Sequence, residues 1–118
     1  MHDAFGLEGR VLDRLVAVFR TFPAIETVIL YGSRAKGTFR DGSDIDITLT
    51  GASLGLRETV FPLSDQLDEL NLPYTFDISI YEQIDNPDLK GHIQRVGRVI
   101  YRAGSTAYAD VPGRGIRS

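Results

Sequence analysis

The chain has 118 residues, 42% of them hydrophobic and 25% charged, with a formal net charge of −3 at pH 7 and no cysteine. This composition is typical of one soluble globular domain, and it excludes disulfides, thiolate metal sites and the basic surface that strong nonspecific binding of nucleic acid requires. No apolar run approaches the roughly 18 residues of a membrane span, and the N-terminus has no signal-peptide core, so we expect a cytoplasmic protein that does not associate with membranes.

The first predicted element is an amphipathic helix over residues 4–21. Its apolar stripe, spaced as on one face of a helix, consists of Leu12, Leu15, Val16 and Phe19. Asp3 is the candidate N-cap, and Pro23 would end the helix. We expect this helix to cover one face of a sheet.

The stretch from residue 28 to residue 50, VILYGSRAKGTFRDGSDIDITLT, predicts a strand, a glycine-rich turn, a loop and a second strand. Gly32 and Ser33 directly follow the first strand, so a turn there would direct backbone N–H groups and a hydroxyl outward. Asp44 and Asp46 share one face of the second strand, because side chains two positions apart do so. Two carboxylates beside such a turn suggest a divalent metal ion that carries a phosphate.

Two other interpretations of this stretch compete with a metal site. Asp, Ser and Gly favour turns for reasons unrelated to catalysis, so GTFRDGSD could be a surface loop whose aspartates cap turns. Gly32 and Gly37 match the first two glycines of a P-loop, but Thr38 stands where that motif needs lysine. The apolar strand before the turn and the alternating strand after it favour the metal site.

The order Gly32-Ser33, ten residues and then Asp44-Ile45-Asp46 resembles the signature of the DNA polymerase β-like nucleotidyltransferase superfamily. The short chain and the sequence GSRAKG resemble its minimal subgroup, the MNT domains. Members of that subgroup commonly pair with a small helical HEPN protein in bacterial and archaeal two-component modules. The resemblance covers residues 28 to about 101, which is most of the chain.

One position departs from the family pattern. Lys36 stands where the GS-x-A-R-G form usually has arginine. The positive charge is kept, so attraction to phosphate survives, but the bidentate fork of arginine is lost.

The polar face of a third predicted strand, residues 74–81, carries a third carboxylate, Asp77. Aspartate is disfavoured inside strands, so something must compensate for it. One interpretation is an exposed aspartate on the wet side of a sheet. If this strand lies next to strand 44–50, Asp77 instead joins Asp44 and Asp46 on one face, and the resemblance implies a catalytic aspartate on such a strand.

Two further helices and a closing strand complete the predicted elements. One helix spans residues 56–70, in which Pro62 marks a kink or the start of the main part. The other begins after Asn86 as N-cap and ends at Gly97 in the left-handed conformation, before a strand at 99–101. This region also contains Asp85, Asp88 and His92. We expect these residues to serve as caps or to occupy exposed helix positions rather than to bind a metal ion.

We therefore predict an α/β (α+β) fold with a small mixed β-sheet. Helices would pack on one face of the sheet and the metal site would lie on the other, as in the polymerase β-like nucleotidyltransferase fold. Residues 1–102 would form the minimal nucleotidyltransferase domain. Residues 103–118, rich in glycine, arginine and small residues, would form a flexible C-terminal tail.

The resemblance implies nucleotidyl transfer with two Mg²⁺ ions, or Mn²⁺ in their place. Asp44 and Asp46 would hold both metal ions. Asp77 would complete the site on the acceptor side and take the proton of the acceptor hydroxyl.

The resemblance also implies the residues that bind the phosphates of ATP. Gly32 and Ser33 would hold the triphosphate through backbone N–H groups and a hydroxyl. Arg34 and Lys36 would stabilise charge on the leaving pyrophosphate.

The acceptor implied by the resemblance is a tyrosine hydroxyl on a HEPN ribonuclease toxin. The chain would transfer AMP to it, act as an antitoxin and form a hetero-oligomer with the toxin. A second interpretation is a nucleotide-binding antitoxin that neutralises its partner by contact alone. A third is transfer to a small molecule or a nucleic acid.

Overall fold

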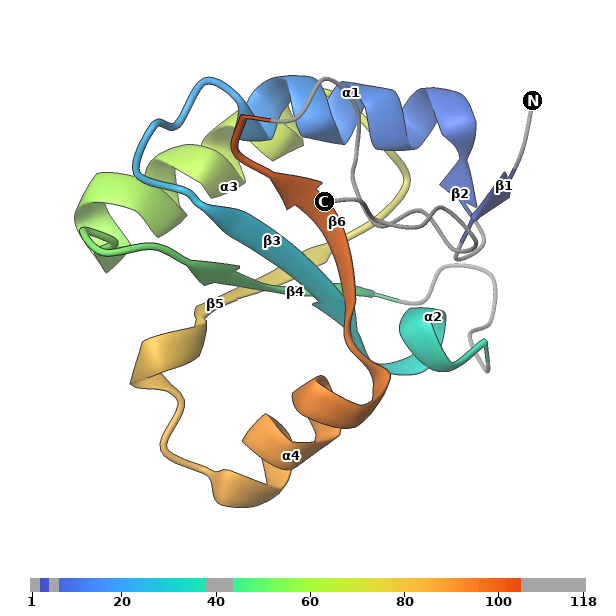
Figure 1. The fold of residues 1–118 in the computed structure, drawn as a ribbon. Helices are drawn as coiled ribbons and strands as arrows, with labels where there is room; N and C mark the ends of the chain where they lie inside the picture. The colour runs from blue at the N-terminus through green and yellow to red at the C-terminus, as the bar shows by residue number, and fades with distance from the viewer. Residues whose placement is uncertain (1–2, 5–6, 38–43, 105–118) are drawn as a thin grey trace.

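Four strands form one mixed sheet, in the order β5-β4-β3-β6, in the computed structural model, which describes residues 3–4, 7–37 and 44–104. The strands are β3 (Thr27–Tyr31), β4 (Ile45–Thr50), β5 (Phe76–Ile80) and β6 (Arg98–Arg102). β4 and β6 both run antiparallel to β3, whereas β5 runs parallel to β4. The small mixed sheet predicted from the sequence is therefore confirmed (Figure 1).

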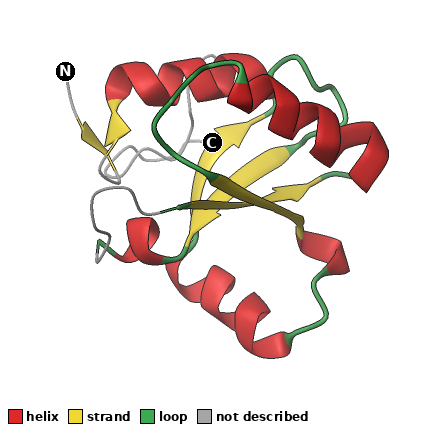
Figure 2. Cartoon of the chain, turned by 180° about the vertical axis from the view of Figure 1, so that it is seen from behind, coloured by secondary structure: helices red, strands yellow, loops and turns green. Residues whose placement is uncertain are grey.

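Helices lie on both faces of this sheet. α1 (Gly9–Phe19) and α3 (Phe61–Asp68) cover one face, and α4 (Pro87–Val96) lies on the other, as two opposite views show (Figures 1 and 2). The short helix α2 (Ser33–Lys36) follows β3, and a pair of two-residue strands, β1 (Asp3–Ala4) and β2 (Leu7–Glu8), precedes α1. The predicted arrangement, with helices on one face, holds for α1 and α3, and α4 departs from it.

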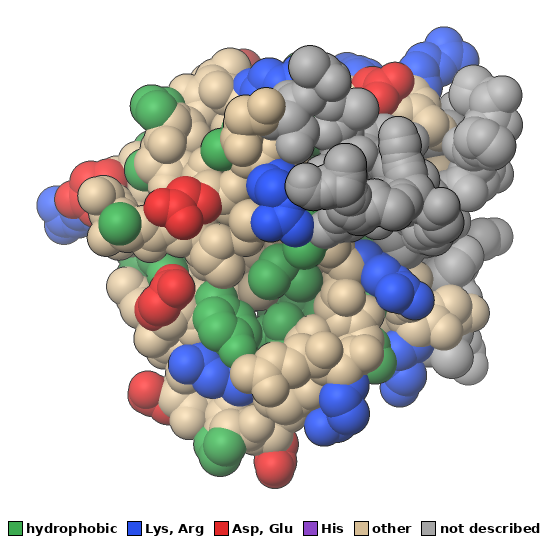
Figure 3. Space-filling model, in the orientation of Figure 1, with side chains coloured by type: hydrophobic (Ala, Val, Ile, Leu, Met, Phe, Trp, Pro, Cys, Tyr) green, Lys and Arg blue, Asp and Glu red, His purple; other side chains and the backbone are tan. Residues whose placement is uncertain are grey.

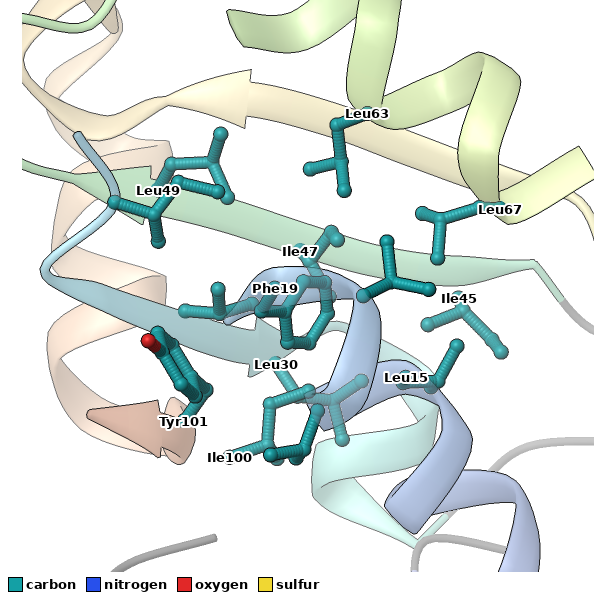
Figure 4. Packing of buried hydrophobic residues seen from close by; sticks show 14 of the residues in the cluster. Leu15, Phe19, Leu30, Ile45, Ile47, Leu49, Leu63, Leu67, Ile100 and Tyr101 are labelled. Carbon is teal, nitrogen blue, oxygen red and sulfur yellow. The ribbon is translucent and has the colours of Figure 1, made fainter. Parts of the chain in front are cut away.

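The face covered by α1 and α3 holds the hydrophobic core. Alternation along β4 points Ile45, Ile47 and Leu49 into this core, and all three are fully buried. Figure 4 shows them near Leu63 and Leu67 of α3. A shift of the β4 register by one residue would move the apolar side chains to the other face, so the core fixes which face the aspartates occupy.

α4 packs on the opposite face over β3, where Ile29 provides an apolar contact. Ile93 is the buried residue of α4. Gly97, just after the helix, lies against Ile29 of β3, since a Cβ on Gly97 would be 2.8 Å from Ile29 Cγ2. Figure 3 shows hydrophobic side chains gathered between the strands and α4. The sequence alone did not show that this second apolar contact exists.

The first helix is shorter than predicted. It begins at Gly9 rather than at residue 4, and it ends at Phe19. Asp3 does not cap it, because Asp3 lies in β1, which pairs with β2. At the other end, the Thr21 hydroxyl donates a hydrogen bond of 2.7 Å to the Val18 carbonyl and closes the last turn.

The second predicted helix consists of two parts. A π-helical turn, η1 (Leu56–Val60), precedes α3, and Pro62 lies in the first turn of α3. Proline fits there because the first N–H groups of a helix have no partner within it. Pro62 therefore marks the start of the main part, as predicted.

The two ends of α4 gave one correct and one wrong prediction. The Asn86 side chain accepts hydrogen bonds from the N–H groups of Asp88, at 2.9 Å, and Leu89, at 3.3 Å, so Asn86 is the N-cap. Gly97 is not left-handed: its φ of −64° and ψ of 147° are extended, and the chain passes directly into β6. Space rather than conformation favours glycine here, because a Cβ would lie 2.4 Å from the Ile93 carbonyl oxygen.

Residues 38–43 and 105–118 lie outside the described residues. Thr38 and nearly all of the predicted tail fall in these segments, so the division of the chain at residue 102 stays a prediction. Within the described part of the chain, no helix combines the length and the apolarity needed to cross a bilayer.

The end of α4 provides a test of the fold. Gly97→Ala would force its Cβ against the Ile93 carbonyl and Ile29, and we expect it to lower the free energy of unfolding by about 1–3 kcal/mol, as overpacking does. Gly91→Ala is the matched control within α4, where the Cβ meets only the flexible end of Arg95 at 3.2 Å. It should be neutral or stabilise the protein by up to about 1 kcal/mol. Urea denaturation measures both, and equal stabilities would contradict the packing of α4 on the sheet.

Candidate active site

Three polar side chains form a row across three neighbouring strands. Asp46 of β4 lies opposite Tyr31 of β3 and opposite Asp77 of β5 in the strand registers. In-register neighbours point to the same face of a sheet, so Asp46 and Asp77 stand side by side. The structure therefore brings together the two aspartates as the strand alternation predicted.

Asp44 lies just before β4 and is exposed. Its carboxylate accepts a hydrogen bond from the Thr75 hydroxyl, and the Ile45 N–H donates to the Thr75 carbonyl at 2.9 Å. Thr75 immediately precedes β5, so these bonds tie Asp44 to the strand that carries Asp77. All three predicted carboxylates thus lie at the same end of the β4–β5 pair.

The electrostatics of Asp46 reflect this crowding. Burial is the main cause that raises the pKa of Asp46 above its ordinary value of 3.8, and the negative charges of Asp77 and Asp44 raise it further. His92 of α4 acts in the opposite direction and lowers it. The ionised carboxylates therefore repel one another, and a bound cation would relieve that repulsion.

The turn after β3 is held tightly against Asp46. Gly32 has a φ of 79° and a ψ of −154°, a region that glycine alone enters readily. A Cβ at Gly32 would lie only 2.2 Å from Asp46 Oδ2. Ser33 then begins α2, and the Lys36 N–H donates to the Gly32 carbonyl at 3.1 Å. The backbone of the glycine-rich turn and the carboxylate of Asp46 thus form one continuous surface.

The two cations of this turn lie in different surroundings. Arg34 is only 3% exposed, and its guanidinium carbon lies 5.0 Å from the centre of the Tyr74 ring. Lys36 is exposed. Arg34 is therefore engaged within the fold by Tyr74, whereas Lys36 is exposed, and the role of both in stabilising charge on the leaving pyrophosphate stays a prediction.

Sequence reasoning missed two residues that face the aspartates. Tyr31 belongs to an apolar run in the sequence, yet it lies in the row with Asp46 and Asp77. His92 does not occupy the exposed helix position that we expected: it is half-buried, and its ring centre lies 6.2 Å from that of Tyr31 with the planes at 80°. Alternation places Tyr31 on the face opposite the core residues Val28 and Leu30, and this could have placed it with the aspartates, whereas the position of His92 depends on where α4 packs.

The donor set fits a hard divalent cation, although the side chains are not gathered around one point. Within residues 7–37 and 44–104, no group of three His, Asp or Glu side chains is arranged as metal ligands. The carboxylate oxygens of Asp44, Asp46 and Asp77 are nevertheless the ligand type that Mg²⁺ prefers. Their mutual repulsion, seen at Asp46, gives them a physical reason to bind a cation.

The comparisons with known proteins agree with this geometry. The family model described as Polymerase beta, Nucleotidyltransferase matches residues 13–105. No curated protein sequence matches the chain significantly. Three solved structures, each under 25% identical, are similar in fold.

The first is a toxin-antitoxin complex with AMP-PNP, at a TM-score of 0.63 and 20% identity, covering 75% of this chain and 70% of that one. The second is a mutant of the MntA-HpeT toxin-antitoxin complex, at a TM-score of 0.61 and 19% identity, covering 75% and 70%. The third is the tri-AMPylated Shewanella oneidensis HEPN toxin in complex with MNT antitoxin, at a TM-score of 0.56 and 17% identity, covering 78% and 71%.

The raised pKa of Asp46 predicts how the metal-free protein responds to a substitution there. Folding makes Asp46 hold its proton more tightly, so its ionisation opposes folding once the pH exceeds the ordinary aspartate range. We expect Asp46→Asn to raise the Tm in EDTA by a few degrees at pH 7, and the difference from wild type to disappear below about pH 3.8, where both states are protonated. Asp65→Asn, an exposed aspartate of α3, is the control and should leave the Tm unchanged. A lower Tm for Asp46→Asn at pH 7 would show that Asp46 stabilises the fold.

The contact between Gly32 and Asp46 predicts a difference between two glycines of one turn. Gly32→Ala must displace the Asp46 carboxylate, and we expect it to weaken binding of Mg²⁺–ATP at least about tenfold, the equivalent of roughly 1.4 kcal/mol. Gly37→Ala is the control for a second positive φ in this turn, 83° with a ψ of 10°, where an added Cβ would meet no atom of the described residues within 4 Å. Isothermal titration calorimetry measures both affinities. Equal losses would attribute the effect to backbone strain and not to Asp46.

Proposed function

The chain belongs to the polymerase β nucleotidyltransferase family, and we propose that it transfers AMP from ATP to a tyrosine hydroxyl of a partner HEPN toxin and thereby acts as an antitoxin. The observation that carries this proposal is the in-register pair of Asp46 and Asp77 with the backbone of Gly32 packed against Asp46. This arrangement supports the proposal, because carboxylates and backbone N–H groups of a glycine turn on one surface are suited to a cation and a phosphate.

Each residue of this surface has a proposed task. Asp44, Asp46 and Asp77 would hold divalent cations, Mg²⁺ or Mn²⁺, which when bound neutralise phosphate charge and polarise phosphate oxygens. Gly32 and Ser33 would bind the triphosphate through backbone N–H groups and the Ser33 hydroxyl. Lys36, which is exposed, and Arg34, which is held against Tyr74, would stabilise charge on the leaving pyrophosphate.

The proposed reaction is an in-line displacement at the α-phosphorus of ATP. The acceptor oxygen forms a bond to the α-phosphorus, the bond to the bridging oxygen breaks, and pyrophosphate leaves. Asp77 accepts the proton that the hydroxyl loses. Asp77 suits this task because it is exposed and stands on β5, one strand further than Asp46 from the Gly32 turn.

The partner in this proposal comes from the structural neighbours. One of them contains AMP-PNP, and another contains a tri-AMPylated HEPN toxin with an MNT antitoxin. Their low identity to this chain means that they support the partner class only as an analogy. A protein that silences its partner by contact alone remains the competing function, and a direct assay of labelling separates the two.

The division of tasks between the aspartates predicts the behaviour of Asp77→Asn. Because Asp77 would act on the acceptor, its loss should reduce AMP transfer at least about 100-fold, as expected for a missing general base, and leave ATP binding nearly unchanged. Purified protein, a HEPN partner, Mg²⁺ and ATP are incubated, and intact mass reports adenylyl groups on the partner.

Asp65→Asn is again the matched control and should label the partner as wild type does. If wild type silences the partner without any change in its mass, and Asp77→Asn does so equally well, the protein acts by contact alone. Labelling by Asp77→Asn at the wild-type rate would remove Asp77 from the reaction.

A further inference from the structure

We infer that Tyr31 is a positioning residue, whose buried hydroxyl holds the carboxylates of Asp46 and Asp77 in place for cation binding. The inference rests on the proposed function, because it concerns the same carboxylates. It adds a residue that is not part of the Gly-Ser or Asp-x-Asp motifs.

Tyr31 occupies an unusual position on the acidic face. It lies opposite Asp46 in the β3–β4 register, so its side chain starts on the same face as the carboxylates. It is nevertheless only 7% exposed. A tyrosine this well buried normally directs its hydroxyl to a partner, because an unpaired buried hydroxyl is costly.

The hydroxyl end of Tyr31 reaches towards β5. Burial raises the pKa of Tyr31 above 10.0, the Ser79 hydroxyl opposes this rise, and the charges of Asp77 and Asp46 add to it. Ser79 and Asp77 both belong to β5, whereas Tyr31 belongs to β3, and β4 lies between these strands. The Tyr31 side chain therefore reaches across β4 towards Ser79, on the face of the sheet that carries Asp46 and Asp77.

Ser79 of β5 also has a hydroxyl whose hydrogen-bonding capacity is not used within the described residues. Its Oγ is buried and has no hydrogen-bond partner of normal geometry among the described residues, although it lies close to Tyr31. In the inferred arrangement the Tyr31 hydroxyl donates to a carboxylate on this face, which fixes a cation ligand.

The ring of Tyr31 is held in place from the other side by α4. His92 meets it edge to face, with ring centres 6.2 Å apart, a geometry that is favourable for aromatic pairs. His92 also acts electrostatically on Asp46. Tyr31 thus lies between α4 and the sheet, and the fold gives its hydroxyl a fixed place beside the aspartates.

The test compares two buried tyrosines. Tyr31→Phe keeps the ring and removes the hydroxyl, and Tyr101→Phe does the same at a tyrosine of β6 that is 5% exposed and packs on Phe19 in the core. Binding of Mn²⁺ alone is measured by electron paramagnetic resonance, and the Tm is measured in EDTA. We expect Tyr31→Phe to weaken Mn²⁺ binding about 10–100-fold, as the loss of a group that orients a metal ligand does, while Tyr101→Phe binds as wild type does.

Each outcome decides between two roles for the hydroxyl. If Tyr31→Phe binds Mn²⁺ as tightly as wild type, or if it melts far below Tyr101→Phe, the hydroxyl serves the fold and the inference is overturned. The proposed function fails separately, if wild-type protein binds Mn²⁺ but labels no partner in the AMP-transfer assay. A wild type that does not bind Mn²⁺ overturns both.

Discussion

The parallel pairing of β4 with β5 is the constraint on which the site depends. It places Asp46 and Asp77 in register, at a position where two carboxylates on neighbouring strands repel each other. Side-chain repulsion of this kind would favour another register if nothing opposed it. The opposing force is the core on the other face, where Ile45, Ile47 and Leu49 are fully buried. Each such side chain contributes roughly 1.5–3 kcal/mol when buried, so the core determines the register and the acidic face follows from it.

The crossover between these two strands has a part in the same constraint. Parallel neighbours need a long connection, and here it is formed by η1 and α3, which supply Leu63 and Leu67 to the core (Figure 4). The helix that permits the parallel pairing therefore also covers the apolar side of the strands it connects. The opposite side is left for Asp46, Asp77 and the Gly32 turn. The crossover through η1 and α3 thus puts the hydrophobic core on one face of β4 and β5 and leaves the carboxylates on the other.

Sequence reasoning predicted what depends on local alternation and on spacing along the chain. The strand periods placed Asp44, Asp46 and Asp77 on polar faces, and Pro62 and Asn86 gave helix starts correctly. It failed where the answer depends on packing between distant segments. The location of α4 over the acidic face, the half-burial of His92 and the extended conformation of Gly97 all follow from contacts with β3. The start of α1 was wrong because residues 7–8 pair with residues 3–4, a two-residue ladder that no period reveals.

The metal-free site carries an unfavourable electrostatic energy that binding can release. Asp46 is desolvated and lies near two like charges, and the backbone of Gly32 packs against it closely enough to limit its movement. Rearrangement cannot easily relieve this repulsion, because the strands on both sides are fixed by the core. A cation that binds the folded state alone adds to stability in proportion to the logarithm of its concentration over its Kd. The same carboxylates that weaken the isolated fold therefore couple its stability to cation binding, and the protein would be most stable with the cation bound.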